Sequence, residues 1–255
     1  MSMLTAKIKT FINSKKYEEA QKKNLIVLNL FTEKDIPDTL KGEAAWSVKH
    51  PSHDARLEEY KKIIRETRTQ HYDTISFGDS LMDGWTKDIF TAVPRCRNFN
   101  VGGSWANHMR DMYRAIFPVL LENRVRFDKV IIGTLGGNPF LMKQPLNLTI
   151  EKSLEVLNDL RKILPVQRII VYGIPPTLSL YANENAPAFE SAIYSWVVQD
   201  VNSVFLPLQR KFAKWGIFPK AVMSTDGVHF SEVGVKEFDA LLVAAKTAKP
   251  RTIVD

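Results

Sequence analysis

The order of apolar and polar residues changes near residue 70 of the chain. Residues 1–70 are polar and rich in lysine, and they contain few of the β-branched runs that indicate buried strands. Short helices are predicted over 6–12 and 17–31, and an amphipathic helix over 56–67. The stretch 35–53 is interrupted by prolines and a glycine and is predicted to be loop.

From Tyr72 onward, short apolar runs alternate with longer helical patterns. Strands are predicted over 73–77, 97–100, 129–135, 168–173 and 221–224. The clearest helices are predicted over 150–164, over 189–214 with an interruption at Pro207, and over 233–246. This alternation predicts an α/β domain over 71–255, with a five-stranded parallel sheet covered on both faces. Residues 1–70 are predicted to be an extension of helices and loops.

The predicted sheet tells where functional residues are expected. In parallel α/β sheets, ligands bind outside the carboxyl ends of the strands. The loops at those ends are 78–85, 101–108, 134–142, 174–187 and 224–231. The loop at 174–187 contains two prolines and is predicted to form one wall of a pocket.

Composition narrows the class of protein. The chain has 255 residues, of which 45% are hydrophobic and 25% charged, and this balance is typical of a globular protein. Cys96 is the single cysteine, so an intrachain disulfide and a thiolate metal site are excluded, and we expect no metal or cofactor. The net charge is +7, but lysine and arginine are spread among acidic residues, so we do not expect a nucleic-acid partner.

The N-terminus gives an expectation about location. Met1–Phe11 carries two lysines, but no apolar run of signal-peptide length follows it. Leu25–Phe31 is too short to span a bilayer. We therefore expect a cytoplasmic protein without a transmembrane segment.

The sequence Gly78-Asp79-Ser80-Leu81 follows the first predicted strand and precedes a helical pattern. A strand–turn–serine–helix arrangement holds a hydroxyl at the mouth of the sheet and places its N–H at a helix N-terminus, where an anion is favoured. The same arrangement is also how an ordinary helix cap looks.

The sequence Asp226-Gly227-Val228-His229 lies in the last of the predicted loops. A serine hydroxyl needs a base, and histidine suits that task near neutral pH. A carboxylate three residues earlier can hold the other ring nitrogen and fix the tautomer. The alternative is a turn in which Asp226 caps the backbone and His229 lies at the surface.

Two glycine-containing segments offer donors for a developing oxyanion. One runs from Asn100 to Ser104 and includes Gly103, whose N–H can approach a substrate without an intervening side chain. The other contains Asn138, whose side-chain NH₂ is a donor. Either segment alone is weak evidence, because turns use glycine routinely.

The four blocks together resemble the GDSL (SGNH) hydrolases, in the order in which they occur in this family. The resemblance covers residues 72–246 and is greatest to compact esterases such as bacterial lysophospholipase/thioesterase enzymes and platelet-activating-factor acetylhydrolase catalytic subunits. It implies a flavodoxin-like three-layer α/β/α fold. It also implies Ser80 as nucleophile, His229 as base and Asp226 as its orienting partner, with an oxyanion hole formed by Ser80, Gly103 and Asn138.

The sequence departs from the family pattern at two positions. Pro139 stands where many relatives carry aspartate, and Asn100 stands where many carry glycine. Asp79, Leu81, Trp85, Trp105 and Pro139 are candidate substrate-binding residues, with core packing as the alternative for the tryptophans. Three further histidines are given structural roles: we expect His50 and His53 to be solvated, and His108 to lie at the surface or to cap a helix.

Three functions are compatible with these residues. The first is hydrolysis of a carboxylic ester with an acetyl or a short to medium acyl group, through an acyl-enzyme on Ser80. The second is transfer of that acyl group to a sugar or lipid hydroxyl. The third is a catalytically silent binding or scaffold protein. The expected substrate is a small molecule, a lipid or an acylated carbohydrate, and the oligomeric state is not predicted.

Overall fold

The computed structural model describes residues 42–83, 95–165, 167–213, 221–224 and 226–254. Its centre is a six-stranded parallel sheet in the order β2-β1-β3-β4-β5-β6. The strands are β1 (His71–Phe77), β2 (Cys96–Asn98), β3 (Arg126–Ile132), β4 (Arg168–Tyr172), β5 (Ser203–Leu206) and β6 (Thr252–Ile253). The helices are α4 (Gly42–Ala45), α5 (His53–Glu66), α6 (Ser80–Asp83), α7 (Ala106–Glu122), α8 (Gly137–Leu141), α9 (Leu146–Ile163), α10 (Leu180–Gln199), α11 (Leu208–Ala213) and α12 (Glu232–Thr247).

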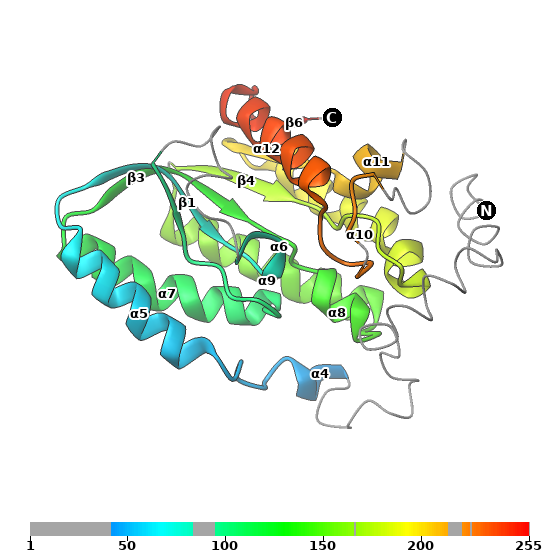
Figure 1. Cartoon of the computed structure of the whole chain (residues 1–255), viewed down its shortest axis with the longest axis horizontal. Helices are drawn as coiled ribbons and strands as arrows, with labels where there is room; N and C mark the ends of the chain where they lie inside the picture. Colours follow the sequence, from blue (N-terminus) through cyan, green and yellow to red (C-terminus); the bar gives the residue numbers. More distant parts are fainter. Residues whose placement is uncertain (1–41, 84–94, 166, 214–220, 225, 255) are drawn as a thin grey trace.

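Helices cover both faces of the sheet, as Figure 1 shows. Successive residues of a strand point to opposite faces, so β3 contributes Val130 and Ile132 to one core and Ile131 to the other. The first core contains residues of α5, α7, α9 and α10, and the second contains residues of α6, α11 and α12. The predicted three-layer α/β/α fold with a parallel sheet is confirmed.

The predicted number of five strands is wrong, because β5 and β6 were not predicted and residues 221–224 do not form a strand. In that segment Met223 makes an isolated antiparallel bridge to Phe230. Residues of β5 lie inside 189–214, which was predicted as one interrupted helix. All four β5 residues are buried, and a short, fully buried apolar run cannot be assigned to strand or helix by periodicity alone.

The order β2-β1-β3-β4-β5 is the flavodoxin-like order, and it creates a switch point between β1 and β3. The chain leaves β1 towards β2 on one side and returns to β3 on the other. The strands are paired in register up to Phe77 and Ile132, so the loops that follow them begin side by side. These loops carry Ser80 and Asn138.

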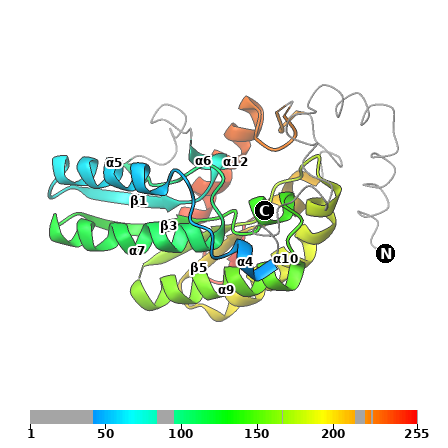
Figure 2. The same cartoon turned by 90° about the horizontal axis from the view of Figure 1, so that it is seen from below.

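The described part of the N-terminal region is packed against the rest of the fold. Figure 2 shows α5 alongside α7. Tyr60 and Ile64 of α5, with Ala45 and Trp46, are buried in the core that contains α7. The short α4 lies within the predicted loop 35–53, and the helices predicted over 6–12 and 17–31 lie outside the described residues. The domain boundary at residue 70 stays a prediction.

Over the ranges that the structure describes, no helix has both the length and the apolar character that a bilayer-spanning segment needs.

Candidate active site

Ser80 opens α6, three residues after the end of β1. The intervening Gly78 is tightly enclosed, because a Cβ there would lie 2.7 Å from the Gly133 carbonyl oxygen and 2.8 Å from the Tyr172 hydroxyl. Asp79 caps the turn, since its Oδ1 accepts a hydrogen bond from the Leu81 N–H at 3.0 Å. The Ser80 hydroxyl is instead 2.8 Å from His229 Nε2.

Asp226 and His229 lie in the loop that precedes α12, and their side chains meet. His229 Nδ1 lies 2.6 Å from Asp226 Oδ2. Asp226 Oδ1 accepts hydrogen bonds from the backbone N–H groups of Val228 at 2.8 Å and His229 at 2.9 Å. An ionised carboxylate is only an acceptor, so the neutral imidazole carries its proton on Nδ1. His229 Nε2 is then available to accept the proton of Ser80.

The hydrogen bonds to Asp226 keep it ionised. Burial alone would raise the pKa of this carboxyl group, but the backbone N–H groups of His229 and Val228 and the side chains of Ser224 and His229 lower it to about 2. Asp226 is therefore a carboxylate at neutral pH and can stabilise a histidinium at position 229.

Asn138 of α8 lies beside the same site, held by two contacts. Its Nδ2 is 3.1 Å from Asp79 Oδ2 and 3.1 Å from the Ser104 carbonyl oxygen. The Thr134 hydroxyl also donates to Asp79 Oδ2. Burial raises the pKa of Asp79 to about 6, although the hydrogen bonds from Thr134 and from the backbone oppose the shift. Asp79 thus links the loops after β1 and β3.

The loop after β2 also lies beside Ser80. A Cβ on Gly102 would lie 3.6 Å from Ser80 Cβ, so this glycine packs directly against the serine. The Gly102 N–H donates to Asp83 Oδ2 at 2.9 Å. Gly103 has φ of +81°, a conformation that favours glycine.

A small cavity of about 20 Å³ opens beside Ser80. Its lining residues are Asp79, Ser80, Leu81, Thr134, Gly137, Asn138, Leu141, Ile174, Pro175, Thr177 and Val228. The volume is enough for about one water-sized group. Part of the segment 174–187, which was predicted to form a pocket wall, therefore does line the cavity. The rest of that segment, from Leu180 onward, belongs to α10.

Most of the predicted site residues come together here. Ser80, Asp226 and His229 form one hydrogen-bonded chain, and Asn138, Asp79 and Leu81 surround the cavity. Trp105 and Pro139 are buried and do not belong to the residues that line it: Trp105 packs edge-on against Trp46, with the ring centroids 5.0 Å apart. The predicted position Trp85 lies outside the described residues.

Of the histidines near the site, His50 and His53 are less solvated than expected, whereas His108 caps a helix, one of the two roles expected for it. His53 and His108 are each 6% exposed. His108 caps α7, since its Nδ1 accepts from the Trp105 N–H at 3.1 Å, and its Nε2 lies 2.8 Å from the Val48 carbonyl oxygen. His50 is half-buried, and its ring centroid lies 5.3 Å from each of the other two. The described residues hold no group of three His, Cys, Asp or Glu arranged to bind a metal ion.

Sequence reasoning gave no supporting role to Thr134, Asp83 or His50. Thr134 and Asp83 could have been found, because both fall in predicted loops at the carboxyl ends of strands. His50 lies outside those loops, and its contact with the backbone has no sequence pattern of its own.

No family model matches the sequence, and no curated protein matches it significantly. Solved structures do match it. A protein from Streptococcus pneumonia named for platelet activating factor aligns with 76% of this chain and 90% of its own, at a TM-score of 0.59 and 15% identity. A proposed acylhydrolase from Bacteroides fragilis aligns with 75% of this chain and 96% of its own, at a TM-score of 0.53 and 16% identity. A GDSL-like lipase from Bacteroides thetaiotaomicron aligns with 75% of this chain and 97% of its own, at a TM-score of 0.51 and 14% identity.

At these identities the similarity shows the fold. The chain has the α/β fold of the GDSL-like (SGNH) hydrolases, as its motifs predicted.

Proposed function

We propose that the protein is a serine ester hydrolase with Ser80 as nucleophile. The observation that carries this proposal is the hydrogen-bonded chain from Asp226 through His229 to Ser80, with 2.6 Å between Asp226 Oδ2 and His229 Nδ1 and 2.8 Å between His229 Nε2 and Ser80 Oγ. The fold shared with proteins named as acylhydrolases and lipases supports the same class of reaction.

The reaction follows from this geometry. Ser80 Oγ attacks the ester carbonyl carbon while its proton passes to His229 Nε2. Asp226 stabilises the resulting imidazolium, which then protonates the leaving alkoxide. The acyl group remains bonded to Ser80 Oγ. A water molecule, deprotonated by His229, attacks the acyl carbon, and the acid is released as the serine regains its proton.

The proposed oxyanion hole consists of the N–H groups of Ser80 and Gly103 and the side chain of Asn138. Donors of this kind stabilise charge that develops in the transition state. Asn138 Nδ2 has two protons, and its two acceptors are Asp79 and the Ser104 carbonyl oxygen. We therefore expect the oxyanion to replace the Ser104 contact, while Asp79 keeps the amide in place.

The size of the cavity favours a short acyl group. A volume of about 20 Å³, lined by Leu81, Leu141 and Ile174, has room for an acetyl methyl. Its apolar side chains suit an alkyl substituent, and the serine and amide groups suit the carbonyl.

A fluorophosphonate probe followed by intact-mass measurement tests the proposal. We expect one adduct on the wild type and none on Ser80→Ala. Ser195→Ala is the matched control, because Ser195 lies on α10 and its hydroxyl donates to the Ser191 carbonyl oxygen. Absence of an adduct on folded wild-type protein would contradict the assignment and favour a binding protein.

A further inference from the structure

The backbone from Asn100 to Gly103 is held by residues that come from outside the motifs of the site. We propose that His50 and Arg56, in the segment before β1, are positioning residues that set the direction of the Gly103 N–H. This inference rests on the proposed function, in which that N–H is an oxyanion donor. It assigns residues 50–60 to the catalytic machinery rather than to a separate extension.

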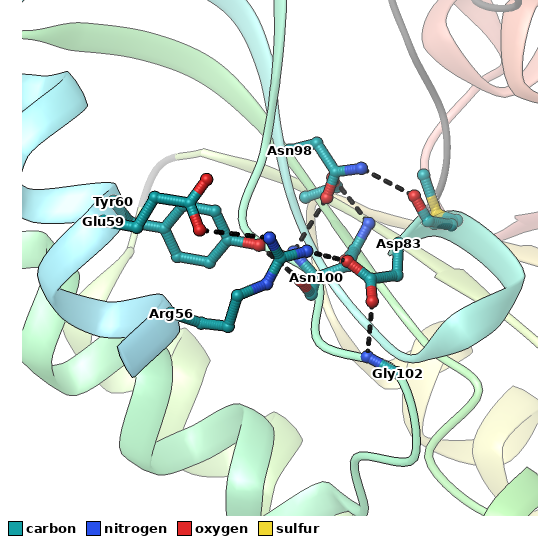
Figure 3. A network of polar contacts seen from close by, with 9 residues as sticks. Arg56, Glu59, Tyr60, Asp83, Asn98, Asn100 and Gly102 are labelled. Atoms are coloured by element: carbon teal, nitrogen blue, oxygen red, sulfur yellow. Dashed lines mark hydrogen bonds and ion pairs between the residues drawn. The ribbon is translucent and has the colours of Figure 1, made fainter. Parts of the chain in front are cut away.

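The first contact runs from α5 through Asp83 to Gly102 (Figure 3). Arg56 Nη2 donates to Asp83 Oδ1, and Asp83 Oδ2 accepts the Gly102 N–H at 2.9 Å. The carboxylate thus uses one oxygen for the helix and the other for the loop. The side chains of Arg56 and Asp83 are 34% and 26% exposed, so this pair is only partly accessible to solvent.

A second contact fixes the chain two residues earlier. The hydroxyl of Tyr60, one helical turn after Arg56, donates to the Asn100 carbonyl oxygen. The Arg56 guanidinium carbon lies 5.5 Å from the Tyr60 ring centroid, and Arg56 Nη1 is 3.1 Å from Glu59 Oε2. Two neighbours, Tyr60 and Glu59, therefore orient the Arg56 guanidinium that donates to Asp83.

His50 holds the other side of Gly102. Its Nδ1 accepts a hydrogen bond from the Ser52 N–H at 3.2 Å, so the neutral ring carries its proton on Nε2. Nε2 is 3.3 Å from the position that a Cβ on Gly103 would take. Burial lowers the pKa of His50, while a hydrogen bond to the Gly102 backbone and the charge of Asp83 act in the opposite direction. His50 Nε2 thus lies against the Gly102–Gly103 backbone with a proton to donate, and the proposal takes the Gly102 carbonyl as its acceptor.

The contacts of Asp83 and Tyr60 hold the two peptides before Gly102, and His50 acts on the next peptide, which carries the Gly103 N–H. In a trans peptide the C=O and N–H groups point to opposite sides. With the Gly102 carbonyl turned towards His50, the Gly103 N–H is turned away from it. Gly103 has no side chain and a φ of +81°, so its own conformation restricts this peptide weakly and the outside contacts are needed. A group that acts through an oxyanion donor should affect kcat rather than substrate binding.

The test compares Arg56→Ala and His50→Ala with the wild type in hydrolysis of a short-chain ester such as 4-nitrophenyl acetate. Active sites are first counted with the fluorophosphonate probe, so that kcat refers to folded, reactive enzyme. We expect kcat per active site to fall about 10-fold to 100-fold, the range for a misplaced catalytic group. KM should stay within about threefold. His50→Gln retains a side-chain N–H near the Nε2 position and should recover much of the loss.

Two matched controls remove side chains of the same chemical types, a cation and a histidine, that do not contact Gly102 or Gly103. Lys62→Ala removes a cation on α5 that is 77% exposed and 4.0 Å from Glu66. His71→Ala removes a histidine that is 2.9 Å from Asp128 on the neighbouring strand. Both should keep the wild-type kcat.

The outcomes separate the two proposals. An unchanged kcat per active site in both Arg56→Ala and His50→Ala overturns the positioning role, even if fewer sites are active or the melting temperature falls. A rise in KM alone also overturns it. If the wild type itself shows neither adduct nor turnover, the proposed function has failed instead. A lower kcat per site with unchanged KM, recovered in His50→Gln, supports the positioning role.

Discussion

Ser80 Oγ and His229 Nε2 are 2.8 Å apart, although 149 positions separate the two residues in the chain. Ser80 is placed by the tight turn after β1. His229 is placed by the loop before α12, where its carbonyl oxygen accepts the Ser224 N–H at 2.7 Å and the adjacent Phe230 bridges to Met223. The contact therefore depends on both loops keeping their backbone conformation.

The first prediction concerns the partner of His229. Asp226→Asn should lower kcat by about 10⁴-fold, because an amide at this position no longer fixes the proton on Nδ1 or stabilises the imidazolium. Steady-state kinetics with a short-chain ester would measure the change. Asp128→Asn, which alters the carboxylate 2.9 Å from His71 Nε2, is the control and should leave kcat unchanged. A loss of less than about tenfold would contradict the role of Asp226.

The second prediction concerns the proposed oxyanion donor Asn138. Asn138→Ala should lower kcat by about 10²-fold to 10³-fold with little change in KM, since the lost hydrogen bond strengthens in the transition state. Asn158→Ala on α9 removes an exposed amide whose Oδ1 accepts from the Trp196 indole N–H at 2.8 Å, and should have no effect on kcat. An unchanged rate in Asn138→Ala would remove this residue from the hole.

The parallel α/β fold could be expected from the alternation of strand and helix patterns. The chain from Ser80 to His229 could be expected from the resemblance of the motifs to those of the GDSL hydrolases. β3 and β4 contain apolar runs, β1 has apolar residues at Ile75 and Phe77, and glycine-containing turns lie at the carboxyl ends of all three strands. The short β5 was not found, since its four buried residues have no polar face to reveal their period.

The supporting contacts could not be predicted, because they join side chains to backbone atoms far along the chain. Asp83 accepts a hydrogen bond from the Gly102 N–H, and His108 lies 2.8 Å from the Val48 carbonyl oxygen. Any residue supplies a backbone group, so no spacing signals such a pair. The prediction that His53 is solvated was wrong. Its burial depends on α5 packing against α7, and the helix pattern alone does not specify that contact.

The third prediction concerns Asp79 and pH. Burial raises the pKa of this carboxyl group from 3.8 to about 6, so the folded state binds its proton more tightly than the unfolded chain does. The free energy of unfolding of the wild type, relative to Asp79→Asn, should therefore fall as the pH rises from about 4 to about 6, by up to about 3 kcal/mol. Urea unfolding at several pH values would measure it, with Asp128→Asn as control. Parallel pH profiles for wild type and Asp79→Asn would contradict the shift.

The fourth prediction concerns acyl length. With a cavity of about 20 Å³ beside Ser80, kcat/KM should be highest for acetyl or propionyl esters and should fall for longer chains. Leu141→Ala removes a side chain from the cavity wall and should move the optimum to longer acyl groups. Leu121→Ala, at a residue that is 79% exposed, should leave the preference unchanged. A wild type that prefers octanoyl esters would show that the cavity does not hold the acyl group.

The last prediction concerns Gly227, which lies between Asp226 and His229. Its φ is +77°, and a Cβ there would lie 2.3 Å from Leu178 Cδ1. Gly227→Ala should therefore displace the loop, lower the melting temperature and lower kcat by weakening the contact between His229 and Ser80. Gly42→Ala is the control: its φ is +52°, but nothing lies within 4 Å of the new Cβ. Both substitutions place alanine at a positive φ, which costs about 1–2 kcal/mol in folding free energy. Only the alanine at position 227 would also clash with Leu178. Equal effects on kcat in the two variants would show that the position of the loop does not control the site.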